Sequence, residues 1–98
     1  MNSDTALITG AGSGIGLALA REFAAHGHPL VLTSRVRAEI QNIAADLRRE
    51  HDIEVWTIAA DLEEPDAAER IFEACNRGRV TVDILVNNAG LQKDAPIH

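Results

Sequence analysis

The sequence predicts an α/β fold, a doubly wound parallel sheet in which strands alternate with helices. Short apolar runs alternate with segments of helical periodicity along the 98 residues. A glycine-rich segment, residues 9–16, follows the first apolar run, where folds of this class turn from a strand into a helix. These two observations predict the element order β-α-β-α-β-α-β with right-handed crossovers. The expected strand order is 3-2-1-4, with the ligand-binding reversal between the first and fourth strands.

Two strands and the helix between them open the chain. Residues 5–9 predict the first strand. Residues 30–33 predict the second, which is apolar throughout, as expected when both faces of a sheet are covered. The intervening helix is indicated by Ile15, Leu19 and Phe23, which recur every four residues and therefore lie on one helix face.

Four further elements continue the alternation. A second helix is predicted by apolar residues at the spacing i, i+3, i+4 and i+7, namely Ile40, Ile43, Ala44 and Leu47. Residues 53–60 predict a third strand and residues 82–86 a fourth, which is followed by a turn over residues 87–90. Pro65 suits the first turn of a third helix. The apolar stripe of that helix comprises Ala68, Ile71, Phe72 and Cys75.

Composition excludes several classes of protein. The formal net charge of −6 leaves no basic surplus for nucleic acid or an anionic membrane surface. Cys75 is the single cysteine, so no internal disulfide can form and a reducing cytoplasm is the expected setting. No apolar run approaches the roughly 18 to 20 residues that span a bilayer, and the N-terminus has no signal-peptide pattern. No histidine or cysteine pair stands at metal-ligand spacing, so we expect no metal site.

The glycines of the first strand–helix turn indicate an anion site. Gly10, Gly14 and Gly16 let the backbone turn tightly and approach a ligand where a β-carbon would collide. A helix N-terminus directly behind the turn offers free N–H groups and a positive dipole end, which suit a phosphate or pyrophosphate. The alternative is a glycine-rich helix entry without a ligand, although a plain turn would not need three such glycines.

The spacing of these glycines separates several nucleotide-binding classes. An NTPase phosphate loop requires a lysine that is absent here. The common Gly-x-Gly-x-x-Gly fingerprint fails, because its third glycine would fall on Ile15 or Leu17. Methyltransferases that use adenosylmethionine usually place a carboxylate at the end of the second strand, where this chain has Thr33, Ser34 and Arg35.

Three motifs together resemble the short-chain dehydrogenase/reductase family. They are Thr-Gly-x-x-x-Gly-Ile-Gly over residues 9–16, Asp61-Leu62 after the third strand, and Asn-Asn-Ala-Gly over residues 87–90. The resemblance covers essentially the whole chain, but only the N-terminal part of a typical family member. It therefore implies that residues 1–98 are the N-terminal part of one Rossmann-like dinucleotide-binding domain, without its C-terminal catalytic half.

The resemblance also implies a set of cofactor-binding residues. The Asp61 carboxylate would accept a hydrogen bond from the adenine amino group, the Leu62 N–H would meet the adenine ring, and the turn after the fourth strand would contact the ribose. Two alternatives stay open: Asp61 as a helix cap paired with Glu64, and residues 87–90 as a simple turn. The implied set is Gly10, Ser13, Gly14, Ile15, Gly16, Ser34, Arg35, Asp61, Leu62, Asn88, Ala89 and Gly90.

Arg35 favours NADP(H) over NAD(H). A carboxylate about 20 residues beyond the glycine loop binds the ribose 2′-hydroxyl of NAD, whereas an arginine there accommodates the 2′-phosphate of NADP. Ser34 and Arg35 occupy that place, residues 32–36 contain no acid, and Arg37 adds to the positive field. The alternative is an ordinary solvated arginine at the start of the second helix.

No catalytic residue can be named from this chain. Family members transfer hydride between a nicotinamide and a carbonyl or alcohol carbon, using a Tyr-x-x-x-Lys motif and a serine that follows the fifth strand. This chain contains no tyrosine, and its serines, Ser3, Ser13 and Ser34, all precede the third strand. We therefore expect the 98 residues alone to be catalytically incompetent.

The resemblance implies that the parent enzyme acts on a small-molecule ketone or secondary alcohol, as a dimer or tetramer in the cytoplasm. Two alternatives apply to the isolated chain. One is a non-catalytic nucleotide-binding module. The other is a fragment that folds only with a partner chain, because an apolar edge over residues 84–86 invites pairing.

Overall fold

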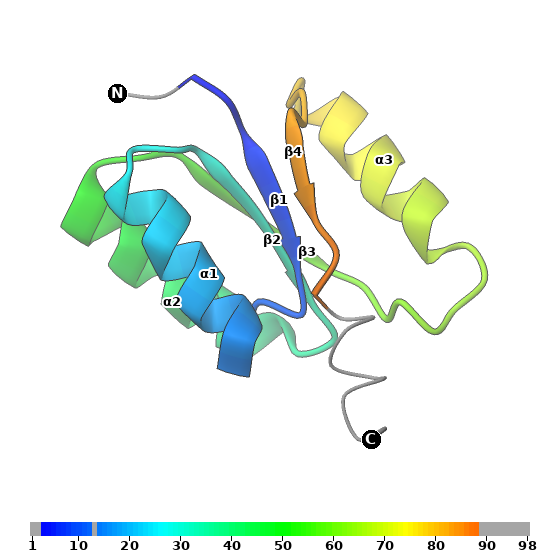
Figure 1. Ribbon diagram of the computed structural model, residues 1–98. Helices are drawn as coiled ribbons and strands as arrows, with labels where there is room; N and C mark the ends of the chain where they lie inside the picture. Colours follow the sequence, from blue (N-terminus) through cyan, green and yellow to red (C-terminus); the bar gives the residue numbers. More distant parts are fainter. Residues whose placement is uncertain (1–2, 13, 89–98) are drawn as a thin grey trace.

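The structure confirms the predicted α/β fold and strand order (Figure 1). It is a computed structural model that describes residues 3–12 and 14–88. The strands β3-β2-β1-β4 form one parallel sheet in that order. The elements of the described part are β1 (Ala6–Thr9), α1 (Gly14–Ala25), β2 (Leu30–Ser34), α2 (Arg37–His51), β3 (Val55–Ala59), α3 (Ala67–Arg77) and β4 (Ile84–Val86).

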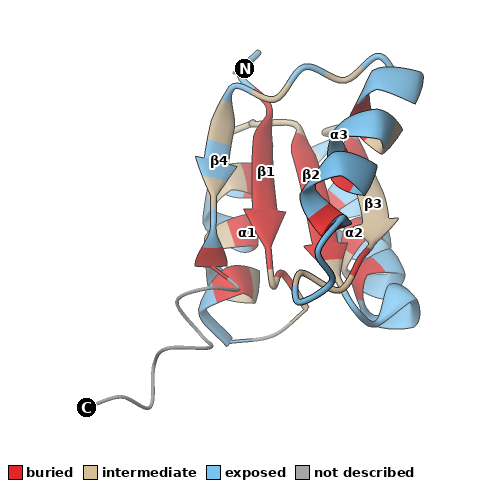
Figure 2. Cartoon of the chain, turned by 90° about the vertical axis from the view of Figure 1, so that its right-hand side faces the viewer, coloured by how far each residue is buried: buried red, intermediate tan, exposed pale blue. Residues whose placement is uncertain are grey.

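Helices cover both faces of the sheet, with α1 and α2 on one face and α3 on the other (Figure 1). Because successive side chains of a strand point to opposite faces, Ala6 and Ile8 of β1 pack toward α1 and α2, while Leu7 packs toward α3. Figure 2 shows that burial is concentrated in β1 and β2, the two central strands. The long apolar run of β2 is therefore explained by cover on both faces.

The start of β4 is fastened to the start of β1 by Asp83. The Thr5 N–H donates to Asp83 Oδ2 at 2.9 Å, and the Asp83 N–H donates to the Thr5 carbonyl at the same distance. This pair sets the parallel register, in which Ala6 lies opposite Ile84. Strands β3 and β4 each begin two residues later than the apolar runs predict, a normal uncertainty at element ends.

The buried face of α1 differs from the face that Ile15 marks. Gly16, Ala20 and Ala24 are buried, and Leu19 and Phe23 are half-buried against the same core, whereas Ile15 is 62% exposed. The small residues on this face let α1 approach closely, as at Gly16, where a β-carbon would meet the Gly10 carbonyl. Larger apolar residues then flank the contact rather than fill it.

The apolar stripe predicted for α3 is wrong at two positions, and its first turn is wrong at a third. Ile71 and Cys75 are buried as expected, but Ala67 replaces Ala68 in the stripe and Phe72 is 64% exposed. Phe72 is rotated from Ile71 by about 100° around the helix, so its side chain is turned from the core toward solvent. Pro65 precedes the helix, whose N-cap residue is Asp66.

The structure confirms that Cys75 is buried, and burial raises the pKa of its thiol because the thiolate loses solvation. None of the helices in the described ranges combines the length and the apolar character needed to cross a bilayer.

The neighbouring residues Ile71 and Phe72 provide a matched test of the α3 rotation. We expect Ile71→Ala to lower the free energy of unfolding by about 2–4 kcal/mol, because it empties a buried site. Phe72→Ala should cost less than about 1 kcal/mol, since its ring is largely in solvent. Urea denaturation of both variants measures the difference, and equal losses would contradict the orientation of α3.

The thiol of Cys75 should react slowly with iodoacetamide in the folded chain. Its raised pKa predicts a rate–pH profile whose midpoint lies above that of the urea-unfolded chain. Stability contributed by the neutral thiol is present below the unfolded pKa and is lost as the pH rises through the folded pKa. Coincident midpoints for the folded and unfolded chain would show that the thiol is solvated.

Candidate functional site

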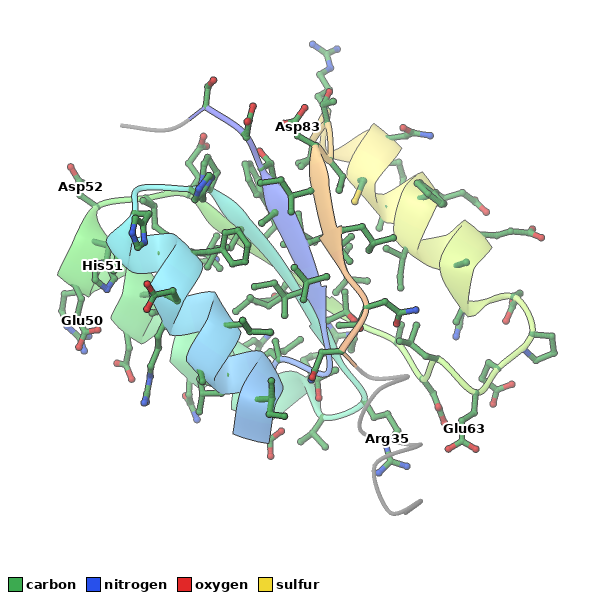
Figure 3. All side chains as sticks on the ribbon, viewed as in Figure 1. Arg35, Glu50, His51, Asp52, Glu63 and Asp83 are labelled. Carbon is green, nitrogen blue, oxygen red and sulfur yellow. The ribbon has the colours of Figure 1, made fainter. Side chains whose placement is uncertain are left out.

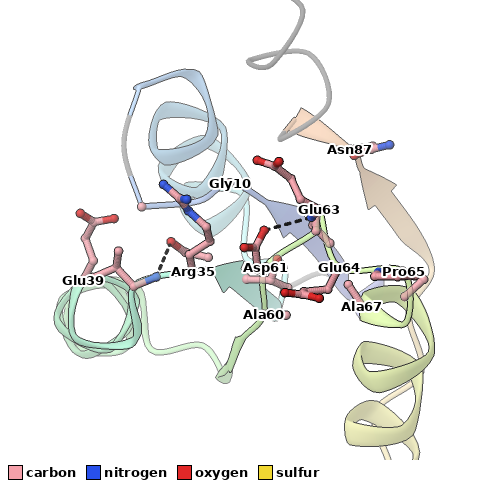
Figure 4. A pocket seen from close by; sticks show the side chains of 16 residues that line it. Gly10, Arg35, Glu39, Ala60, Asp61, Glu63, Glu64, Pro65, Ala67 and Asn87 are labelled. Atoms are coloured by element: carbon pink, nitrogen blue, oxygen red, sulfur yellow. Dashed lines mark hydrogen bonds between the residues drawn. The ribbon is translucent and has the colours of Figure 1, made fainter.

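A pocket of about 810 Å³ opens at the carboxyl ends of the strands. This is within the range of pockets that hold small-molecule ligands and cofactors. Figure 4 shows it enclosed by the glycine loop, the ends of β2 and β3, and the first turns of α2 and α3. Its lining residues are Gly10, Gly12, Thr33, Ser34, Arg35, Val36, Glu39, Ala60, Asp61, Leu62, Glu63, Glu64, Pro65, Ala67, Ala68 and Asn87.

The glycine loop is positioned by the strand beside it and by the helix behind it. Gly10 has φ 62, a left-handed conformation that side chains disfavour. The Ala11 N–H donates to the Thr33 carbonyl at 3.1 Å, so the loop continues the β1–β2 pairing. A β-carbon on Gly16 would lie 2.0 Å from the Gly10 carbonyl oxygen, which shows how closely α1 approaches the loop.

Asn88 joins the loop to the end of β4. Its side chain is fully buried, and Nδ2 donates to the Gly10 carbonyl at 3.3 Å. The Thr9 hydroxyl lies 3.3 Å from both the Val86 carbonyl and Asn87 Oδ1, which ties the ends of β1 and β4. Asn88 Oδ1 and Thr33 Oγ1 are buried side-chain oxygens without a hydrogen-bond partner among the described residues. Such atoms are common at ligand sites.

Arg35 follows β2 directly and lies in the pocket with an exposed guanidinium (Figure 4). The turn that presents it is closed by Ser34, whose Oγ accepts a hydrogen bond from the Val36 N–H at 3.2 Å. Figure 3 shows Arg35 and Glu63 at the same end of the molecule, opposite Asp83. The only cation that lines the described pocket is therefore held at the end of β2.

Asp61 follows β3 and closes a turn rather than capping α3. Its Oδ1 accepts the Glu63 N–H at 3.0 Å, and its carbonyl accepts the Glu64 N–H at 3.0 Å. The cap pairing of Asp61 with Glu64 is thus wrong for the helix, since the N-cap residue is Asp66. The turn holds the Asp61 carboxylate at the pocket wall.

The pocket brings together five of the residues expected in the cofactor site: Gly10, Ser34, Arg35, Asp61 and Leu62. Four others do not line it. Gly14 and Ile15 are exposed in the first turn of α1, while Gly16 and Asn88 are buried and support the loop. Ser13, Ala89 and Gly90 lie outside the described residues.

Glu39 is the pocket residue that the sequence motifs missed. Its Oε1 lies 1.9 Å from where a β-carbon on Gly12 would stand, so the carboxylate touches the loop. The usable signal is its position about 20 residues after the glycines, just beyond the segment in which an acid is sought. Asp61, Glu63 and Glu64 add further carboxylates to the wall. The described residues contain no cluster of three His, Cys, Asp or Glu side chains suited to a metal ion.

A parallel α/β sheet with a glycine turn, a pocket at its strand reversal and buried polar atoms behind the turn defines a nucleotide-binding protein. The family model described as short chain dehydrogenase matches residues 4–98. The chain belongs to the short-chain dehydrogenase/reductase family, a family of oxidoreductases.

Curated relatives from bacteria match nearly all of this chain. It is 40% identical over 93 residues to 1-deoxy-11-beta-hydroxypentalenate dehydrogenase of Streptomyces arenae, which covers 93% of this chain and 33% of that protein. It is 42% identical over 89 residues to serine 3-dehydrogenase of Agrobacterium fabrum, and the match covers 91% of this chain and 34% of that protein. The chain thus spans about a third of the length of these relatives.

Solved structures of similar proteins include two with bound NADPH. L-sorbose reductase of Gluconobacter frateurii, complexed with NADPH and L-sorbose, has a TM-score of 0.81 and 32% identity, covering 86% of this chain and 32% of that one. A short-chain dehydrogenase of Sphingobium yanoikuyae in complex with NADPH has a TM-score of 0.74 and 40% identity, and the match covers 84% of this chain and 32% of that one.

The close approach at Gly16 can be tested against Gly12. We expect Gly16→Ala to destabilise the chain by about 1–3 kcal/mol, because its methyl group would meet the backbone oxygen of Gly10. Gly12→Ala should cost less than about 1 kcal/mol, because it meets side-chain atoms, chiefly the end of the flexible Glu39 side chain, and no backbone. Thermal unfolding compares the two, and a harmless Gly16→Ala would disprove the tight contact.

Proposed function

We propose that this chain binds NADP(H) as the cofactor-binding part of an enzyme that transfers hydride between NADP(H) and a ketone or secondary alcohol. The observation that carries the proposal is the pocket that joins the Gly10 turn, Arg35 and Asp61 at one edge of the sheet. The NADPH complexes of the Gluconobacter and Sphingobium proteins support it. These described residues fit a dinucleotide in size, backbone access and chemistry.

Each end of the pocket has chemistry for one part of the cofactor. The Arg35 guanidinium is planar and permanently charged, which suits bidentate binding of the 2′-phosphate beside Ser34. The Asp61 carboxylate accepts a hydrogen bond from the adenine amino group, next to Leu62. The glycine turn admits the pyrophosphate, with Gly14 and Ile15 at the N-terminus of α1, and the family resemblance adds Ser13 to this contact. When bound, the nicotinamide supplies or accepts the hydride.

Gly16 and Asn88 act indirectly in this scheme. Both are buried behind the loop, where Asn88 holds the Gly10 carbonyl through its amide. They position the turn that meets the pyrophosphate, while the family resemblance assigns contact with the ribose to Ala89 and Gly90. Loss of the Asn88 amide would therefore loosen the binding site without removing a ligand contact.

Residues 1–98 form the N-terminal part of a single dinucleotide-binding domain in this proposal. The chain contains no tyrosine, so the acid–base step belongs to residues outside these 98, and the isolated chain turns over no substrate. The same absence favours a second candidate, a nucleotide-binding module without catalysis. The whole enzyme would act in the cytoplasm on a small-molecule substrate, as a dimer or tetramer, with no nucleic-acid or membrane partner.

Calorimetric titration of the chain with NADPH, NADH and adenosylmethionine tests the proposal. We expect heat from the two dinucleotides, tighter binding of NADPH, and none from adenosylmethionine. Arg35→Ala should weaken NADPH roughly 10- to 100-fold through the lost charged hydrogen bonds, and change NADH little.

Arg37→Ala is the matched control, because Arg37 is exposed nearby but does not line the pocket. It should leave the ratio of the NADPH and NADH dissociation constants close to that of the unmodified chain. Absence of heat from both dinucleotides would reject the cofactor-binding function, and equal losses in the two arginine variants would reject the 2′-phosphate role of Arg35.

A further inference from the structure

We propose that Glu39 is a second determinant of cofactor choice, whose carboxylate accepts a hydrogen bond from an adenosine ribose hydroxyl and admits NAD(H) to the site. The inference rests on the proposed function, because it concerns the same pocket. Residues 32–36 contain no acid, so the end of the second strand itself supplies no carboxylate for the ribose. The fold brings the carboxylate of Glu39, from the first turn of α2, to that end of the strand.

The position of Glu39 is set by α2. The residue lies in the first turn of the helix, and the next residue, Ile40, is fully buried in the core under α1 and α2. Burial of Ile40 anchors the first turn of α2 in the core, and the Glu39 side chain extends from that turn. Figure 4 shows this side chain extending from the start of α2 toward the glycine loop.

The Glu39 carboxylate lies between the loop and the end of β2. A β-carbon placed on Gly12 would stand 1.9 Å from Glu39 Oε1 and 3.3 Å from Ser34 Oγ. Both oxygens therefore approach one point beside Gly12, on the wall that also carries Arg35. A ribose bound between the glycine turn and Arg35 would therefore lie next to this carboxylate.

Carboxylate chemistry at this point discriminates between the two cofactors. A carboxylate accepts a hydrogen bond from the 2′-hydroxyl of NAD(H), whereas it repels the 2′-phosphate of NADP(H). Arg35 has the opposite preference. We infer that the two side chains counterbalance each other, so the site prefers NADP(H) while still binding NAD(H).

The remaining carboxylates of the pocket allow a matched control. Glu64 lines the same pocket from the β3 side, with its backbone N–H donating to Asp61. Glu64→Gln removes the same charge from the same pocket as Glu39→Gln. A general electrostatic effect would tighten every anionic ligand in both variants, and most of all the ligands with the most phosphate charge. Loss of a local hydrogen bond would instead weaken NADH, and only in Glu39→Gln.

Dissociation constants of NADPH, NADH, 2′,5′-ADP and 5′-AMP, measured calorimetrically on the full chain and on both variants, test this inference. In Glu39→Gln we expect NADPH and 2′,5′-ADP to bind about fivefold more tightly and NADH about fivefold more weakly. Glu64→Gln should weaken none of the four ligands, and should tighten most those with the most phosphate charge. Each ratio is taken within one sample, so a change in folded fraction cancels.

The outcomes separate this inference from the proposed function. An unchanged NADPH to NADH ratio in Glu39→Gln, with both dinucleotides still bound, overturns the role of Glu39 and leaves the cofactor site standing. NADH binding that is unchanged or tighter in Glu39→Gln, as it is in Glu64→Gln, also overturns it, in favour of bulk electrostatics. Failure of the unmodified chain to bind either dinucleotide overturns both.

Discussion

The missing side chain at position 16 is the constraint on which the site depends. Only a glycine lets α1 come so near to the Gly10 carbonyl, and the same carbonyl accepts the amide of buried Asn88. One backbone oxygen thus fixes the loop after β1, the start of α1 and the end of β4. The loop after β1 thereby forms one wall of the pocket, which the ends of β2 and β3 and the starts of α2 and α3 complete.

Most of the fold follows from the sequence because each signal is local. Apolar runs and helical spacing within short segments predicted the strands, their order and the second helix, and the structure confirms them. The rotation of α1 and α3 was not predictable in this way. Ile15 and Phe72 are apolar, but which side of a helix meets the sheet depends on how close the helix can approach. That distance is set by contacts distant in sequence.

The candidate site shows the same division. Gly10, Arg35 and Asp61 stand within two residues of a strand end, so parallel strands bring them to one edge, and their convergence could be predicted. Glu39 stands within a helix and reaches the loop only through its long side chain. Sequence motifs record residues at strand ends, whereas a side chain that arrives from a neighbouring helix carries no spacing signal of comparable strength. Whether a residue contacts the ligand or supports the loop, as Gly16 and Asn88 do, likewise needs the packing.

The charge of the pocket indicates that binding of the proposed cofactor would depend more on backbone geometry than on long-range electrostatic attraction. One guanidinium faces four carboxylates along the described lining, in a chain of net charge −6, yet the proposed ligand is a polyanion. Long-range attraction therefore cannot concentrate the cofactor at this site, because the surrounding field has the wrong sign. In the proposed complex, affinity would come from short-range contacts: N–H groups at the start of α1, the guanidinium of Arg35, and a turn narrow enough to bring them to the phosphates. Such contacts tolerate no displacement of the loop, and the close contact between Gly16 and the Gly10 carbonyl prevents that displacement.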